Sequence, residues 1–236
     1  MTQSDNPKTI AILGGTGNQG PGLAMRWALA GHRIIIGSRK QAKAERVAGE
    51  VNARLADADG PVAHPVTGMV NRDAAEACEV AVLTVPFGAQ NALLEGLNGA
   101  LEGKVLVNVN VALKPPKVTR VFIPPEGSAC EQAQAILGEA TPVVGAFQNV
   151  SAHVLDALEE PVNCDVLVCG DDADAKALAI ALAQDMGTRA FDAGPLANAK
   201  AVEGLTAILI KLNIQHKVHG SGIRITNLPE SAGSRE

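Results

Sequence analysis

The chain has 236 residues, of which 47% are hydrophobic and only 2% aromatic, and its formal net charge is −5. This length and apolar content suffice for one large α/β domain, or for a nucleotide-binding domain with a small appendage. The acidic balance and the lack of a dense basic run argue against nucleic acid as a partner. Because no apolar run is long enough to span a bilayer, we expect no membrane association.

The cysteines indicate a reducing compartment. The chain has four of them, and none forms a CxxC pair or a zinc-like cluster with histidine: Cys78, Cys130, Cys164 and Cys169. Residues 1–8 are polar and lack the apolar core of a signal peptide. We therefore predict a cytoplasmic protein with reduced thiols and no metal site.

Short apolar runs alternate with Ala-rich amphipathic stretches along the first half of the chain. The predicted strands cover residues 9–13, 33–36, 66–70, 80–85 and 105–109. The predicted helices cover residues 21–30, 41–55, 73–78 and 89–97. Strands separated by helices predict a doubly wound, mostly parallel sheet of the α/β class.

The second half begins with an irregular loop, because residues 111–127 contain four prolines. Ser128 and Glu131 then form a capping box that opens a helix ending near residue 137. Further strands are expected at residues 142–147, 165–169 and 189–192, and helices at 173–186 and 198–216. The polar tail at 227–236 is predicted to be disordered.

A glycine-rich turn joins the first predicted strand to the first predicted helix. Its sequence is GTGNQG, at residues 15–20. In such a GxGxxG turn the first glycine permits the tight turn, the second admits the pyrophosphate, and the third permits close helix–strand packing. The sequence therefore predicts a dinucleotide on the free N–H groups at the start of the helix.

The end of the second predicted strand distinguishes NADP from NAD. An NAD site places an acidic side chain there to bind the ribose hydroxyls, but this chain has Ser38, Arg39 and Lys40, with Lys43 one turn later. A serine hydroxyl can donate a hydrogen bond to a 2′-phosphate, and a guanidinium can bind it in a bidentate manner. We therefore predict NADP(H) as the cofactor.

The sequence offers no clear proton donor for catalysis. There is no Tyr, no G-x-S-x-G elbow and no HExxH motif. His153 could act as a general acid, although a surface histidine near a helix start is the more common explanation. Reducing a carbonyl or imine usually needs a donor, whereas hydride transfer between two flat rings needs mainly alignment. We therefore predict hydride transfer between two redox cofactors, with no catalytic side chain.

Five segments together form a recognisable pattern: IAILGGTGNQG (10–20), GSRKQAKAE (37–45), VLTVP (82–86), VCGDD (168–172) and DAGPLAN (192–198). They resemble the coenzyme F420:NADP oxidoreductases, the NADPH-dependent F420 reductases. The resemblance extends over residues 9–228, and its last two segments are much more specific than the glycine-rich one. It implies hydride transfer between NADP(H) and the 8-hydroxy-5-deazaflavin coenzyme F420, by a homodimer.

The resemblance also implies which residues bind the two cofactors. It places NADP(H) against the glycine-rich turn, the basic turn and Ala152, and the deazaflavin beside residues 148–150. The full predicted set is Gly15, Thr16, Gly17, Asn18, Gln19, Gly20, Ser38, Arg39, Lys40, Lys43, Val85, Pro86, Gln148, Asn149, Val150 and Ala152. We predict an NADP-binding Rossmann domain at 1–192, and a C-terminal helical part at 193–236 that completes the deazaflavin pocket and the dimer interface. Where this chain has Gln148, family members often have histidine.

Two other functions remain open from the residues alone. One is an NADP-dependent reductase of another acceptor, such as a flavin, a ferric chelate or an imine. The other is a redox sensor that binds NADP(H) without turnover. A β-hydroxyacid dehydrogenase fits less well, because Lys211 and Asn213 are two residues apart and diverge on a helix.

Overall fold

The computed structural model describes residues 4–58, 62–229 and 232–233 of the chain. Strands and helices alternate through its first half, as the apolar periodicity predicts. The elements of this half are β1 (Thr9–Leu13), α1 (Gly20–Leu29), β2 (Arg33–Ser38), α2 (Gln41–Asp57), β3 (Thr67–Val70), α3 (Asn71–Ala77), β4 (Val80–Leu83), α4 (Phe87–Gly96) and β5 (Val105–Asn108).

The second half follows an irregular segment after β5. Its elements are α5 (Ala129–Leu137), β6 (Val143–Gly145), α6 (Ala152–Asp156), β7 (Val166–Gly170), α7 (Ala173–Asp185), β8 (Ala190–Asp192), the 3-10 helix η1 (Leu196–Asn198) and α8 (Ala199–His216). The hydroxyl of Ser128 accepts a hydrogen bond from the N–H of Glu131, which confirms the predicted start of α5. The sequence prediction missed α6, because five residues show no clear helical periodicity.

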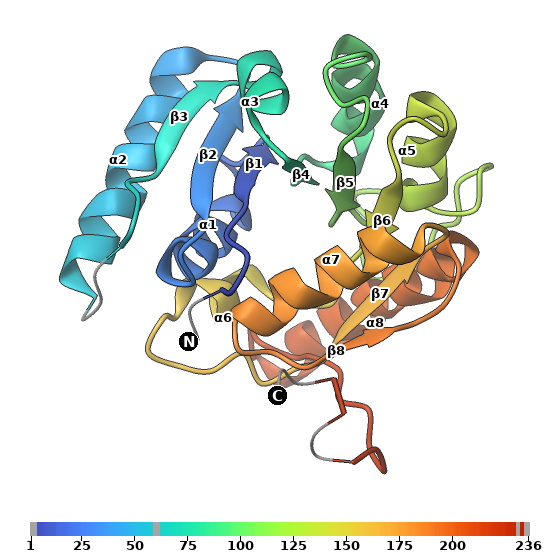
Figure 1. Ribbon diagram of the computed structural model, residues 1–236. Helices are drawn as coiled ribbons and strands as arrows, with labels where there is room; N and C mark the ends of the chain where they lie inside the picture. The colour runs from blue at the N-terminus through green and yellow to red at the C-terminus, as the bar shows by residue number, and fades with distance from the viewer. Residues whose placement is uncertain (1–3, 59–61, 230–231, 234–236) are drawn as a thin grey trace.

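All eight strands form one sheet in the order β3-β2-β1-β4-β5-β6-β7-β8. Strands β1 to β6 are parallel, whereas β7 pairs antiparallel with β6 and carries β8 parallel to itself. Figure 1 shows the helices on both faces of this sheet. The doubly wound, mostly parallel fold with a helical C-terminal part is therefore confirmed. The strand order reverses direction between β1 and β4, which is where such sheets bind ligands.

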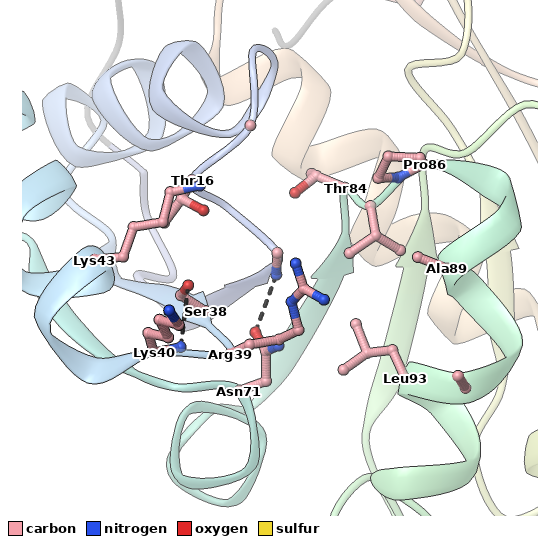
Figure 2. A pocket seen from close by; sticks show the side chains of 14 residues that line it. Thr16, Ser38, Arg39, Lys40, Lys43, Asn71, Thr84, Pro86, Ala89 and Leu93 are labelled. Atoms are coloured by element: carbon pink, nitrogen blue, oxygen red, sulfur yellow. Dashed lines mark hydrogen bonds between the residues drawn. The ribbon is translucent and has the colours of Figure 1, made fainter.

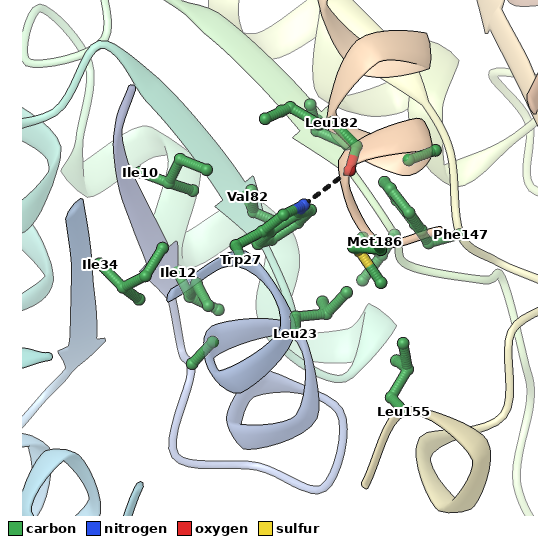
Figure 3. Packing of buried hydrophobic residues seen from close by; sticks show 14 of the residues in the cluster. Ile10, Ile12, Leu23, Trp27, Ile34, Val82, Phe147, Leu155, Leu182 and Met186 are labelled. Carbon is green, nitrogen blue, oxygen red and sulfur yellow. Dashed lines mark hydrogen bonds between the residues drawn. The ribbon is translucent and has the colours of Figure 1, made fainter. Parts of the chain in front are cut away.

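Two apolar cores cover the two faces of the sheet. Alternate residues of β1 divide between them, with Ile10 and Ile12 on one face and Ala11 and Leu13 on the other. The first core includes residues of α1, α2, α6 and α7, and the second includes residues of α3, α4, α5 and α8. In Figure 3, Trp27 lies at the centre of the first core, between α1 and α7.

The C-terminal part lies against β7 and α5. The buried carboxylate of Glu203 on α8 accepts backbone hydrogen bonds from Ala112, Ala129 and Cys130. Burial raises the pKa of Glu203, while these three N–H groups act in the opposite direction. This one side chain therefore joins α8 to the start of α5 and to the start of the irregular segment that follows β5.

The tail differs in part from its predicted disorder. The carbonyl of Gly233 accepts hydrogen bonds from the N–H of Ala190 at 2.9 Å and from the amide of Gln184 at 3.1 Å. Residue 233 is therefore held against β8 and α7, whereas 230–231 and 234–236 lie outside the described residues. Among the helices described, none has the length and apolar character needed to cross a membrane.

Candidate functional site: the cleft at the glycine-rich loop

The loop between β1 and α1 begins one residue earlier than the predicted motif. Gly14 has φ +72°, and a Cβ on it would lie 2.2 Å from a methyl carbon of Val85. Gly15, to which we assigned the tight turn, donates from its N–H to the carbonyls of Ile12 and Gly37, both at 3.0 Å. Gly14 therefore supplies the left-handed conformation that only glycine adopts at low cost.

The other two glycines of the motif have the surroundings that a dinucleotide site requires. A Cβ on Gly20 would lie 2.2 Å from the carbonyl oxygen of Gly15, so this position must be glycine for helix and loop to pack. A Cβ on Gly17 would be in ordinary van der Waals contact, 3.8 Å from the carbonyl oxygen of Gly14, and Gly17 borders a large cleft. The loop therefore forms a cradle with room for a pyrophosphate at the N-terminus of α1.

A cleft of about 900 Å³ opens in front of this loop. Its lining residues come from the glycine-rich loop, from the ends of β2, β3 and β4, and from α2 and α4. They are Gly14, Thr16, Gly17, Ser38, Arg39, Lys40, Lys43, Asn71, Thr84, Val85, Pro86, Ala89, Ala92 and Leu93. Figure 2 shows the basic residues on one wall and Thr84, Pro86, Ala89 and Leu93 on the other. The cleft thus has one polar, cationic wall and one mainly apolar wall.

Three cations line this cleft without a carboxylate beside them. Arg39, Lys40 and Lys43 take part in none of the ion pairs found within residues 4–58, 62–229 and 232–233, and no lining residue is acidic. The guanidinium of Arg39 extends into the space between the walls (Figure 2). Ser38 is buried, and its hydroxyl accepts a hydrogen bond from the N–H of Lys40 at 3.4 Å. This arrangement suits a phosphate at the carboxyl end of β2.

A second cleft of about 550 Å³ lies on the other side of the glycine-rich loop. Gly17 lines both clefts, and Asn18 and Ala152 line this one together with residues of α2 and α6. His153 is exposed at its rim, and its ring lies 4.9 Å from that of His219 between centroids. Two predicted cofactor residues therefore lie beside α6, away from the basic wall.

The turn after β6 brings together the remaining predicted residues. The side-chain amide of Gln148 donates to the carbonyl of Asn108 at 3.0 Å and to the sulfur of Cys130 at 3.5 Å. The amide of Asn149 donates to the carbonyl of Val202 and the hydroxyl of Thr206, both on α8. Both side chains are therefore buried, and their amide nitrogens donate within the protein. Their amide oxygens have no hydrogen-bond partner among the described residues.

The structure adds residues that the sequence analysis did not select. Asn71, which follows β3, accepts a hydrogen bond from the N–H of Gly14 at 3.1 Å and so supports the glycine-rich loop. Thr84 donates to the carbonyl of Leu13 at 3.1 Å. A polar residue directly after a parallel strand was a usable signal for both, because ligands bind at that edge of the sheet. Ala89, Ala92 and Leu93 gave no such signal, since helical apolar residues usually fill cores.

The fold and the cleft together define a dinucleotide-binding protein of the Rossmann class. Residues 9–112 match the protein family described as "NADP oxidoreductase coenzyme F420-dependent". The F420-dependent NADP reductase of Methanocaldococcus jannaschii is 44% identical over 93% of this chain and 98% of that protein. That of Methanothermobacter marburgensis is 45% identical over 94% and 99%. The chain belongs to this family, as the sequence resemblance predicted.

A solved structure supports the same fold. The crystal structure of an Arthrobacter sp. FB24 protein superposes on this chain with a TM-score of 0.77, and covers 92% of this chain and 99% of that one. The two sequences are only 23% identical, so this likeness concerns the fold alone.

Proposed function

We propose that this protein transfers a hydride between NADP(H) and the deazaflavin coenzyme F420. The observation that carries the proposal is the cleft at the switch point of the sheet, where a glycine-rich cradle meets a wall of cations that form no ion pair within the described part of the chain. The family's F420-dependent NADP reductases, 44% and 45% identical over nearly the whole chain, support the identity of both co-substrates.

The cofactor's phosphates are held by two parts of the cleft. The N–H groups at the start of α1 would bind the pyrophosphate beside Gly17, which lines the cleft. Ser38, Arg39 and Lys43 would bind the 2′-phosphate, which is the group that distinguishes NADP from NAD. Val85 and Pro86 lie at the end of β4, between the cradle and the carboxyl end of β5, and direct the rest of the cofactor toward the turn after β6.

The acceptor side is formed by the turn at 148–150, whereas Ala152 belongs to the NADP(H) side. The reduced nicotinamide would supply the hydride and bulk solvent the accompanying proton, so no side chain of the protein has to ionise during the transfer. The side-chain amides of Gln148 and Asn149 donate within the protein and hold the turn. We therefore propose that these two residues contact the deazaflavin through their backbone and through the surface that the turn presents. Their role is to exclude water and keep the rings aligned.

We further propose that residues 193–236 complete the deazaflavin pocket and the dimer interface, beside an NADP-binding domain at 1–192. Helix α8 supports the interface, because Ile208 and Ile214 are 51% and 62% exposed. Val121 is 51% exposed and lies 3.5 Å from where a Cβ on Gly204 would be, so it extends this apolar surface. Exposed apolar surface of this kind marks an interaction site. We also propose a cytoplasmic location, because all four cysteines are free and buried.

The function is tested by mixing the protein with NADPH and oxidised F420 and following the deazaflavin absorbance. We expect bleaching at a rate that saturates with both compounds. Turnover with a flavin, a ferric chelate or an imine but not with F420 would identify a different reductase. Tight NADPH binding without turnover of any acceptor would identify a sensor.

A further inference from the structure

Two side chains, one directly before α1 and one within it, hold the segment 147–160, which lies more than 120 positions away in sequence. The first is Gln19, directly before the helix. Its amide donates to the carbonyl of Phe147 at 3.3 Å and to that of Val150 at 3.4 Å. The side chain of this predicted cofactor residue is therefore directed at the turn after β6.

The second side chain is Arg26, two turns further along α1. Its Nε donates to the carbonyl of Leu155 at 2.9 Å. Its Nη2 donates to the carbonyls of Val154, Ala157 and Glu160 at 2.8, 2.7 and 3.1 Å. Arg26 is 1% exposed and has no carboxylate partner among the described ion pairs, so these carbonyl dipoles stabilise the buried charge.

Helix α1 also packs closely against residues 147–160. A Cβ on Gly22 would lie 2.7 Å from the Cβ of Leu155, so α6 packs directly on the backbone of α1. At the other end, Phe147 has φ +67°, a conformation that costs free energy for a bulky residue. The Gln19 amide helps to stabilise that conformation, because it donates a hydrogen bond to the carbonyl of Phe147.

We propose that Gln19 and Arg26 are positioning residues for hydride transfer. The N-terminus of α1 lies at the pyrophosphate cradle, and the same helix fixes residues 147–160, which include the acceptor-side turn at 148–150. Helix α1 thereby sets the spacing between the phosphate-binding end of the site and the place where the rings meet. This inference rests on the proposed function, since the spacing matters most for a reaction that depends on ring alignment.

The first test replaces Gln19 by Met, which keeps the length of the side chain and removes both donors. Gln134→Met is the control, because the Gln134 amide also donates to two backbone carbonyls, those of Gly138 and Thr141. It accepts a third hydrogen bond from the N–H of Val143, so this variant removes one hydrogen bond more than Gln19→Met does. In the cofactor-free protein, we expect hydrogen–deuterium exchange of residues 147–153 to accelerate at least about fivefold in Gln19→Met only. Unchanged exchange in this segment would overturn the proposal.

The second readout separates positioning from binding. The dissociation constant of NADPH should stay within about twofold in Gln19→Met, because backbone N–H groups and the basic wall bind the phosphates. Single-turnover hydride transfer to F420 should slow about tenfold, with a primary isotope effect from deuterated NADPH. A loss of NADPH affinity that accounts for the slower rate would overturn the proposal, as would equal slowing in Gln134→Met.

Arg26→Lys tests the other end of the segment while keeping a buried cation. We expect faster exchange over residues 153–160 and slower hydride transfer at unchanged NADPH affinity. Unchanged exchange and rate would remove Arg26 from the proposal. If the wild-type protein does not reduce F420, the proposed function fails, while the exchange measurements still decide whether α1 holds this segment.

Discussion

The rings of Trp27 and Phe147 meet edge to face, with centroids 5.6 Å apart and an interplanar angle of 86°. Trp27 is the only tryptophan of the chain, and its indole N–H donates to the carbonyl of Leu182 at 2.8 Å. One side chain of α1 therefore contacts both the turn after β6 and helix α7 (Figure 3). The core that supports the first half of the sheet is continuous with the segment that carries the acceptor side.

Trp27→Phe should lower the free energy of unfolding by about 2–4 kcal/mol. The smaller ring leaves a cavity, and the carbonyl of Leu182 loses its indole donor in a buried position. Urea denaturation followed by circular dichroism measures the change, since the variant has no tryptophan. A loss below about 0.5 kcal/mol, the range of ordinary surface substitutions, would contradict this account of the core.

Local patterns were sufficient to predict most of the elements and one side of the site. The strand at 9–13 was predicted with its observed bounds, because its four apolar residues follow Lys8 and Thr9 and end at the glycine-rich turn. The role of the basic turn after β2 was also predictable, since an NAD site would place an acidic residue there to bind the ribose hydroxyls. The lining of the cleft by Thr16, Ser38, Arg39 and Lys43 follows from these two local signals.

Long-range contacts could not be read from the sequence. Arg26 resembles any surface arginine of an amphipathic helix, yet it is buried against carbonyls 128 to 134 positions away. Asn71 supports Gly14 across 57 positions. Periodicity reports which face of an element is apolar, and it carries no information on which distant backbone groups that element will meet.

Arg39→Ala should weaken NADPH binding by roughly 1.5–3 kcal/mol and leave NADH binding nearly unchanged. The expected loss is that of a charge-assisted hydrogen bond to the 2′-phosphate, which NADH lacks. Calorimetric titration with both cofactors measures it. Arg33→Ala is the control, because Arg33 is an exposed cation at the opposite end of the same strand. Equal losses for both cofactors would refute the assignment of Arg39.

Ile208→Glu should convert the protein from a dimer to a monomer at micromolar concentration. A carboxylate in an apolar interface would be buried without a partner, which opposes association. Light scattering gives the mass of both proteins, and Ala53→Glu adds the same charge at an exposed position of α2 as a control. A wild-type protein that is already monomeric would refute the proposed interface.

Asp165→Asn should lower the free energy of unfolding at neutral pH. It should also make that free energy decrease less steeply as the pH falls. Burial raises the pKa of Asp165, but hydrogen bonds from Arg189 and from the N–H of Ile225 outweigh it and lower the pKa below its usual 3.8. A lowered pKa stabilises the fold above about pH 4, and this contribution is lost as pH falls through the folded-state pKa.

The measurement for Asp165 is the free energy of unfolding between pH 7 and pH 3. We expect the variant to lose about 2 kcal/mol at pH 7, the scale of hydrogen bonds to a charged group. Its stability should fall less steeply than that of the wild type below pH 4. Parallel curves for the two proteins would show that Asp165 is not the group responsible.

His153→Ala should leave turnover with F420 within a few-fold of the wild type, well short of the roughly 10²–10⁴-fold loss expected for a general acid. Direct hydride transfer between aligned rings requires no proton from the protein, and His153 is exposed, with its ring beside that of His219. Gln148→Ala and Asn149→Ala should instead raise the Michaelis constant for F420 and lower turnover modestly, because they loosen the turn tied to α5 and α8. Steady-state kinetics at several F420 concentrations separate these effects. A His153→Ala variant that binds NADPH normally but is inactive toward F420 would contradict transfer by ring alignment alone and would assign this histidine a part in proton transfer.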